Sequence, residues 1–112
     1  MRTYLIEDFL PEQQAKVCQR LADMGLTGPL DGIYYLPLPA GLLTEEQREH
    51  SAECGPYIFV LEAEGESNLK LELLVRAQSK LRCSCVAYAT PEQRAHIMDY
   101  MDNLLRELDI TV

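Results

Sequence analysis

The residues with the clearest chemical potential in this sequence are one histidine and three cysteines. His50 and Cys54 are four positions apart in a segment with helical signals, and such positions share one face of a helix. Cys83 and Cys85 are two positions apart in a segment of alternating polarity, and such positions share one face of a strand. Imidazole nitrogen and thiolate sulfur are ligands that zinc prefers. The four residues therefore define a candidate zinc site, with thiol redox chemistry as the related alternative.

A second interpretation of the cysteine pair is core packing. The spacing of the four residues differs from the two-residue gaps of common zinc motifs. Cys83 and Cys85 also fall in register with Leu81 and Ala87, and a cysteine can serve as a small apolar core residue. From the sequence alone we favour core packing for this pair. We expect Cys54, which precedes a Gly-Pro turn, to be the most exposed thiol.

The sequence contains no common catalytic signature. No serine stands in a Gly-x-Ser-x-Gly turn, and no glycine-rich loop precedes a helix as nucleotide binding would require. An enzyme built on Tyr34, Tyr35, Tyr88 and His96 would have only those residue types to support it. We therefore predict no catalytic or cofactor-binding residues and lean towards a non-enzymatic protein.

Helix signals and alternation predict the elements that must position these side chains. The first helix opens at Pro11 and ends at Gly25, a short polar helix follows the cap Thr44, and the last helix starts after the cap Thr90. Four segments have the residue types or the alternation of strands. They are residues 33–38, 57–64, 69–77 and 81–89.

This order of elements predicts an α+β fold. We expect one domain over residues 1–112, formed as a two-layer sandwich. An antiparallel sheet of about four strands should carry the N- and C-terminal helices on one face, in the order α-β-α(short)-β-β-β-α.

The other face of the predicted sheet is half apolar. Alternation sends five apolar side chains to this face, which is more than water solvates well. They are Ile58, Val60, Leu74, Val86 and Tyr88. The leading functional hypothesis is therefore a non-catalytic interaction or ligand-binding module that forms a homodimer or holds a protein partner there. The alternative is a metal-binding or thiol-redox protein that uses Cys54, Cys83, Cys85 and His50.

Charge and composition narrow the expected partners and location. The formal net charge of −8 repels polyanions, so we expect no nucleic-acid partner. The N-terminus has no apolar run of signal-peptide length, and no segment is apolar enough to cross a membrane. We expect a cytoplasmic protein with reduced thiols and no membrane contact.

Overall fold

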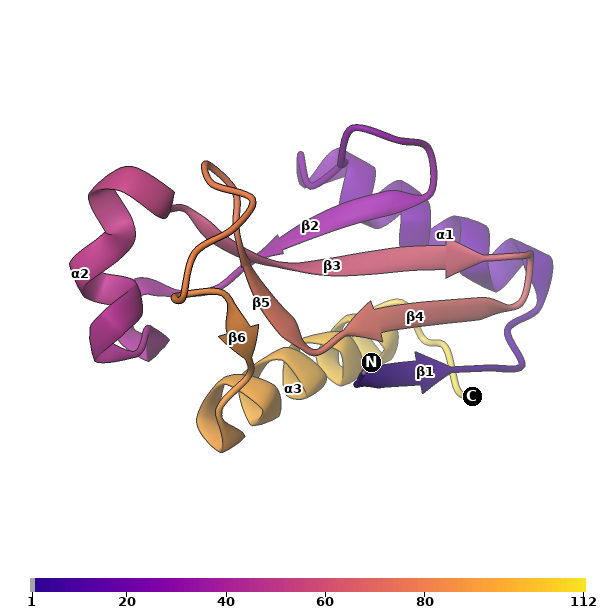
Figure 1. Cartoon of the computed structure of the whole chain (residues 1–112). Coiled ribbons are helices and arrows are strands. Elements are labelled where there is room, and N and C mark those ends of the chain that lie inside the picture. The colour runs from indigo at the N-terminus through magenta and orange to yellow at the C-terminus, as the bar shows by residue number, and fades with distance from the viewer. Residues whose placement is uncertain (1) are drawn as a thin grey trace.

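Two long helices cover one face of an antiparallel sheet, and a shorter helix stands at one end of it (Figure 1). The computed structural model describes residues 2–112. Within them the helices are α1 (Pro11–Asp23), α2 (Glu45–Cys54), α3 (Pro91–Glu107) and the short 3-10 helix η1 (Ala40–Leu42). The strands are β1 (Thr3–Ile6), β2 (Ile33–Pro37), β3 (Tyr57–Glu64), β4 (Asn68–Glu72), β5 (Leu74–Ala77) and β6 (Ala87–Tyr88). The predicted α+β class, with the first and last helices on one face of the sheet, is confirmed.

The central strand of the sheet is β3. It pairs with β2 along one edge and with β4 and then β5 along the other. β1 pairs with β4, and β6 pairs with β5, and all of these pairings are antiparallel. Between β4 and β5, the N–H of Leu73 donates to the carbonyl of Arg2 (3.0 Å), and its carbonyl accepts from the N–H of Ala89 (2.8 Å). β4 and β5 together therefore form one long strand beside β3, and the strand on its outer side changes from β1 to β6 at Leu73.

The core lies between the sheet and the two long helices. Phe59 and Leu61 of β3 are fully buried, whereas Val60 and Glu62 point to the other face and are half-buried, as alternation requires. The apolar stripes of α1 and α3 pack against the buried face. Their most buried members are Val17, Leu21, Ile97, Met101 and Leu104.

Local signals explain where the helices begin and end. Pro11 occupies the first turn of α1, and Gly25 ends that helix with φ of +77°, which glycine adopts without steric cost. The N–H of Leu26 then donates to the carbonyl of Leu21 (3.0 Å), which closes the C-terminus of the helix. α2 and α3 both begin with the Thr–Gln capping box seen in the sequence. No helix within residues 2–112 is both long and apolar enough to cross a bilayer.

The sheet has more strands than the sequence predicts, six within the described residues instead of about four. β1 is a short strand of four residues, and such a segment is too short to show alternation clearly. The predicted strand 69–77 is divided at Leu73 into β4 and β5. These differences extend the sheet without changing its class.

The predicted strand 81–89 is mostly a loop, and only its residues in β6 pair with the sheet. Leu81 is 85% exposed and Ala87 is also exposed, so the inward orientation expected from alternation is wrong for these two residues, whereas Cys85 is buried in the core. The reason lies in the preceding turn. The N–H groups of Gln78 and Ser79 donate to carbonyls at the end of α2 and just beyond it, so the chain leaves β3 at this point.

Candidate metal centre

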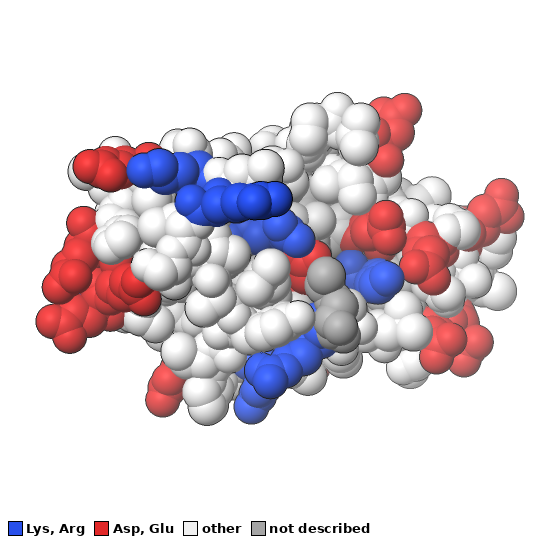
Figure 2. Space-filling model, viewed as in Figure 1, with Lys and Arg blue, Asp and Glu red and all other residues white. Residues whose placement is uncertain are grey.

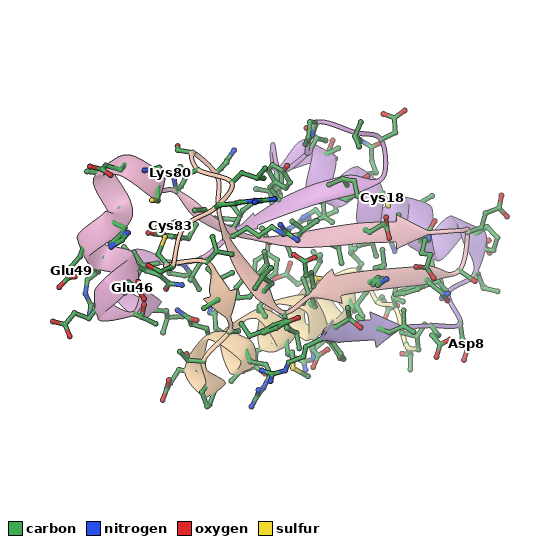
Figure 3. All side chains as sticks on the ribbon, in the orientation of Figure 1. Asp8, Cys18, Glu46, Glu49, Lys80 and Cys83 are labelled. Atoms are coloured by element: carbon green, nitrogen blue, oxygen red, sulfur yellow. The ribbon has the colours of Figure 1, made fainter. Side chains whose placement is uncertain are left out.

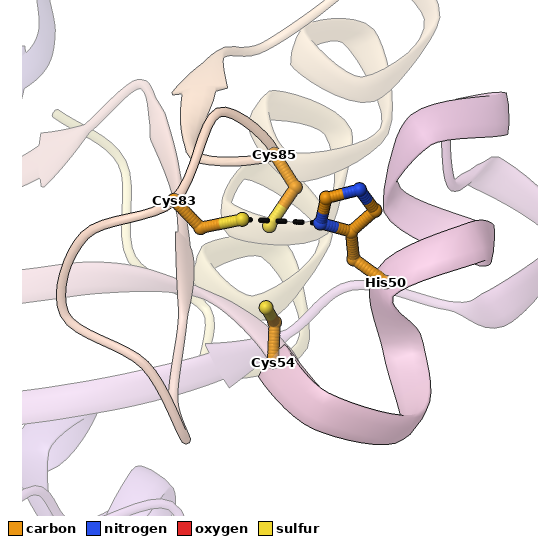
Figure 4. Close-up of side chains that lie close together, drawn as sticks. All are labelled: His50, Cys54, Cys83 and Cys85. Carbon is orange, nitrogen blue, oxygen red and sulfur yellow. Dashed lines mark hydrogen bonds between the residues drawn. The ribbon is translucent and has the colours of Figure 1, made fainter.

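The structure brings together the four candidate ligands, His50, Cys54, Cys83 and Cys85. One ligand atom from each residue lies within 4.8 Å of the others. The first two come from α2, where the four-residue spacing places them on one face as predicted. The cysteine pair comes from the loop between β5 and β6 (Figure 4). The site therefore joins one helix and one loop.

Hydrogen bonds attach the start of this loop to the end of α2. The carbonyl of Cys54 accepts the N–H of Ser79 (3.0 Å), and the carbonyl of Pro56 accepts the N–H of Gln78 (2.9 Å). Between these acceptors, Gly55 approaches α2 so closely that a Cβ would lie 2.8 Å from the carbonyl oxygen of Ser51. A larger residue would have to displace this backbone carbonyl, so glycine at position 55 permits the close approach at the end of α2.

Further contacts turn the loop towards α2. The N–H of Val86 donates to the carbonyl of Cys83 (3.1 Å), which closes a tight turn around the cysteine pair. Ser84, between the two cysteines, donates its hydroxyl proton to the carboxylate of Glu46 on α2. An exposed ion pair between Lys80 and Glu53 (3.7 Å) joins the same two elements, although such pairs contribute little stability. The cysteines are thus held by the loop's own geometry and by α2.

The site has a buried side and a more open side. Cys54 and Cys85 are each 1% exposed, whereas His50 and Cys83 are half-buried. The expectation that Cys54 is the most exposed thiol is wrong, because its side chain at the end of α2 points into the core. Cys85 joins the core cluster and Cys83 packs at its margin, so core packing and ligand geometry are compatible for this pair.

The protonation states of the metal-free site differ between its two sides. The Nδ1 atom of His50 lies 3.1 Å from the Sγ of Cys83. Hydrogen bonds from the backbone and thiol of Cys85, together with the one from His50, lower the pKa of Cys83 to about 6. Burial, followed by hydrogen bonds with the other two thiols, raises the pKa of Cys54 to about 11. The hydrogen bond with Cys83 raises the pKa of His50.

The separations of these atoms suit one tetrahedral ion. Zn–S bonds of about 2.3 Å and Zn–N bonds of about 2.0 Å put the tetrahedral ligand atoms of such a set roughly 3.5–3.8 Å apart. The observed upper separation of 4.8 Å is therefore within a small side-chain adjustment of a closed site. With four protein ligands, such a site leaves no open coordination position.

Two glutamines near the site were not identified by sequence reasoning as functional. Gln47 and Gln93 are recognisable as capping-box residues, and both are almost fully buried. The amide of Gln47 donates to the carbonyl of Cys85 (3.2 Å). A capping box in a sequence indicates a helix start, but it does not reveal what else the amide reaches.

The remaining chemical candidates lie elsewhere. Cys18 of α1 is far from Cys83 (Figure 3), and all four cysteines are free thiols. Tyr34 is buried in the core, and Tyr35, next to it on β2, points to the opposite face. The tyrosines of β2 therefore do not combine into one site.

The five residues of the expected interface have different environments. Ile58 is only 6% exposed, Val60 and Leu74 are half-buried on the open face, and Val86 packs against the core. Tyr88 is 38% exposed, with the guanidinium of Arg2 4.6 Å from its ring centroid. Figure 2 shows Lys and Arg side chains across this face, with acidic side chains at the α2 end and again at the opposite end. Association through this face stays a prediction.

Comparison with known proteins adds no family to this description. No protein-family model, curated protein or solved structure matches the chain.

Proposed function

We propose that this protein binds one zinc ion through the Nδ1 of His50 and the Sγ atoms of Cys54, Cys83 and Cys85. The observation that carries this proposal is the convergence of four ligand atoms from two separate segments within 4.8 Å. Three thiolates and one imidazole form a ligand set that zinc prefers in structural sites. We therefore favour the metal-binding hypothesis over the interaction module that the sequence alone favours.

The proposed role of the ion is structural. Four protein ligands leave no position for a substrate or a reactive water, which catalytic zinc sites keep open. The ion instead joins the loop between β5 and β6 to α2, which stands at one end of the sheet. Zinc coordination requires thiolates, so the proposal includes a reducing compartment such as the cytoplasm.

The related alternative is thiol redox chemistry at the same cluster. Cys83 has the lowered pKa of a reactive thiol, and two further sulfurs lie beside it. Zinc and disulfide formation compete for these sulfurs. The two functions therefore predict opposite states of the purified protein: a stoichiometric metal with three protected thiols, or a disulfide without metal.

The test is metal content and cobalt spectroscopy of the purified full chain. We expect one zinc per chain, and after exchange for Co²⁺ an absorption spectrum with thiolate-to-cobalt charge transfer and tetrahedral d–d bands. Cys85→Ser should abolish both signals. Cys18→Ser is the matched control, because it removes a cysteine outside the cluster and should leave both signals unchanged. A full zinc content in Cys85→Ser would contradict the proposed ligand set.

A further inference from the structure

Buried glutamines connect two helix starts to the proposed zinc site. Among the described residues, the buried polar side chains are Gln14, Gln47 and Gln93. The last two have relative exposures of 2% and 1% and are joined by a hydrogen bond from Nε2 of Gln93 to Oε1 of Gln47 (3.0 Å). Buried amides of this kind are retained only where their hydrogen bonds are made.

The bonds form one continuous path. Oε1 of Gln93 accepts the N–H of Thr90 (3.1 Å), and its Nε2 also donates to the carbonyl of Leu42 (2.7 Å). Oε1 of Gln47 accepts the N–H of Thr44 (3.0 Å), and its Nε2 donates to the carbonyl of Cys85 (3.2 Å). Each glutamine therefore caps its own helix and also holds a neighbouring element.

The orientation of both amides is fixed by these partners. Turning the amide of Gln93 would place its oxygen against the carbonyl of Leu42 and its NH₂ against the N–H of Thr90. Flipping the amide of Gln47 would place its oxygen against the carbonyl oxygen of Cys85, and the hydrogen bond would be lost. No buried side-chain nitrogen or oxygen among the described residues lacks a partner. The path thus has one satisfied arrangement, which makes it a rigid support.

We infer that Gln93 is a positioning residue of the proposed zinc site, acting through Gln47 on the backbone of Cys85. This inference rests on the proposed function. Groups that orient metal ligands from outside the coordination sphere commonly change metal affinity by about 10- to 100-fold when removed. Here the support comes from α3, which contributes no ligand. By thermodynamic reciprocity, zinc bound at the loop holds the start of α3 in place.

The test compares two buried glutamines. Gln93→Met keeps a side chain of similar length but removes both polar atoms. Gln14→Met is the matched control: the amide of Gln14 is also buried and donates to two carbonyls, those of Gly65 and Asn68, but it belongs to α1. Both variants should lower the stability of the metal-free protein. Zinc affinity, measured by competition with a chromophoric chelator well below the unfolding temperature, should fall about 10- to 100-fold in Gln93→Met alone.

A second variant keeps the test decisive if Gln93→Met does not fold. Gln93→Glu retains an acceptor for the N–H of Thr90, so the cap of α3 is kept while the two amide donors are lost. Its control is Gln14→Glu. Folded Gln93 variants with wild-type zinc affinity would overturn the inference and leave the zinc site standing, and so would an equal loss in the Gln14 variants. A wild-type chain that binds no zinc would overturn the proposed function and this inference with it.

Discussion

Zinc at the proposed site should raise the free energy of unfolding by an amount set by the free zinc concentration. The ligands belong to two segments separated by about 30 residues, so the unfolded chain must close a long loop before it offers the complete set and binds the ion much more weakly. An ion that binds only the folded state stabilises it by RT ln(1 + [L]/Kd). This is about 2.7 kcal/mol at a free zinc concentration of 100 times Kd, and about 4.1 kcal/mol at 1,000 times Kd.

The corresponding change in melting temperature is large enough to measure. An unfolding entropy of about 2.1 cal/mol/K per residue gives about 0.24 kcal/mol/K for 112 residues. The stabilisation of about 2.7 kcal/mol at 100 times Kd should therefore raise Tm by about 11 °C, and each further tenfold increase in free zinc should add about 6 °C. Thermal melts followed by circular dichroism in zinc buffers measure both values.

Two variants decide where the stabilisation originates. Cys54→Ser removes a buried ligand of the proposed site and should lose the dependence of Tm on zinc. Cys18→Ser should keep the full dependence, because Cys18 lies outside the cluster. A zinc-dependent Tm that is unchanged in Cys54→Ser would refute the reasoning, and so would a wild-type Tm that does not respond to zinc at all.

Three further predictions concern protonation, packing and association. In metal-free protein, the rate of alkylation of Cys83 should rise as pH increases through about 6 and should level off by about pH 8. The pKa of Cys83 is lower in the folded than in the unfolded protein, so its thiolate stabilises the fold. This contribution to the free energy of unfolding is complete above the ordinary thiol pKa and is lost as pH falls through 6. A midpoint near the ordinary thiol pKa would contradict the assigned hydrogen bonds. Leu105→Ala should cost about 2–5 kcal/mol in denaturant titrations, since Leu105 is 7% exposed in the core; a cost well below 1 kcal/mol would mean that this face of α3 packs differently. If the open sheet face self-associates, sedimentation should show a wild-type dimer that Val60→Glu with Leu74→Glu dissociates, and a wild type that is monomeric at high micromolar concentration removes the dimer.

The helices and the long strands could be predicted from sequence because their signals are local. Prolines, threonine caps and Gly25 mark helix ends within a few residues, and the run of aromatic and aliphatic residues at the start of β3 is typical of a strand. The segment 81–89 shows the limit of such patterns. Its alternation predicts a strand, but hydrogen bonds from the preceding turn to the end of α2 direct it away from the sheet.

The four residues of the candidate site could be identified from the sequence, but their proximity in the fold could not. The spacing of His50 and Cys54 on a helix is local and is confirmed. The proximity of Cys83 and Cys85 to that helix depends on contacts between residues about 30 positions apart, and no local pattern encodes such contacts. The burial of Cys54 was missed for the same reason. A polar helix with glutamates on most sides gives no indication that the side chain of Cys54 in its last turn points into the core.

The chain order of the ligands has a consequence for the time course of folding. β3, β4 and β5 lie between the two halves of the site, so an ion that meets the chain early finds only half of its ligands. If the full coordination sphere closes only after the hairpin of β3 with β4 and β5 has formed and the folding transition state has been passed, the ion stabilises the native state alone. Interactions that are absent from the transition state slow unfolding and leave the folding rate nearly unchanged. Zinc at this position would therefore lengthen the lifetime of the native protein without hastening its formation.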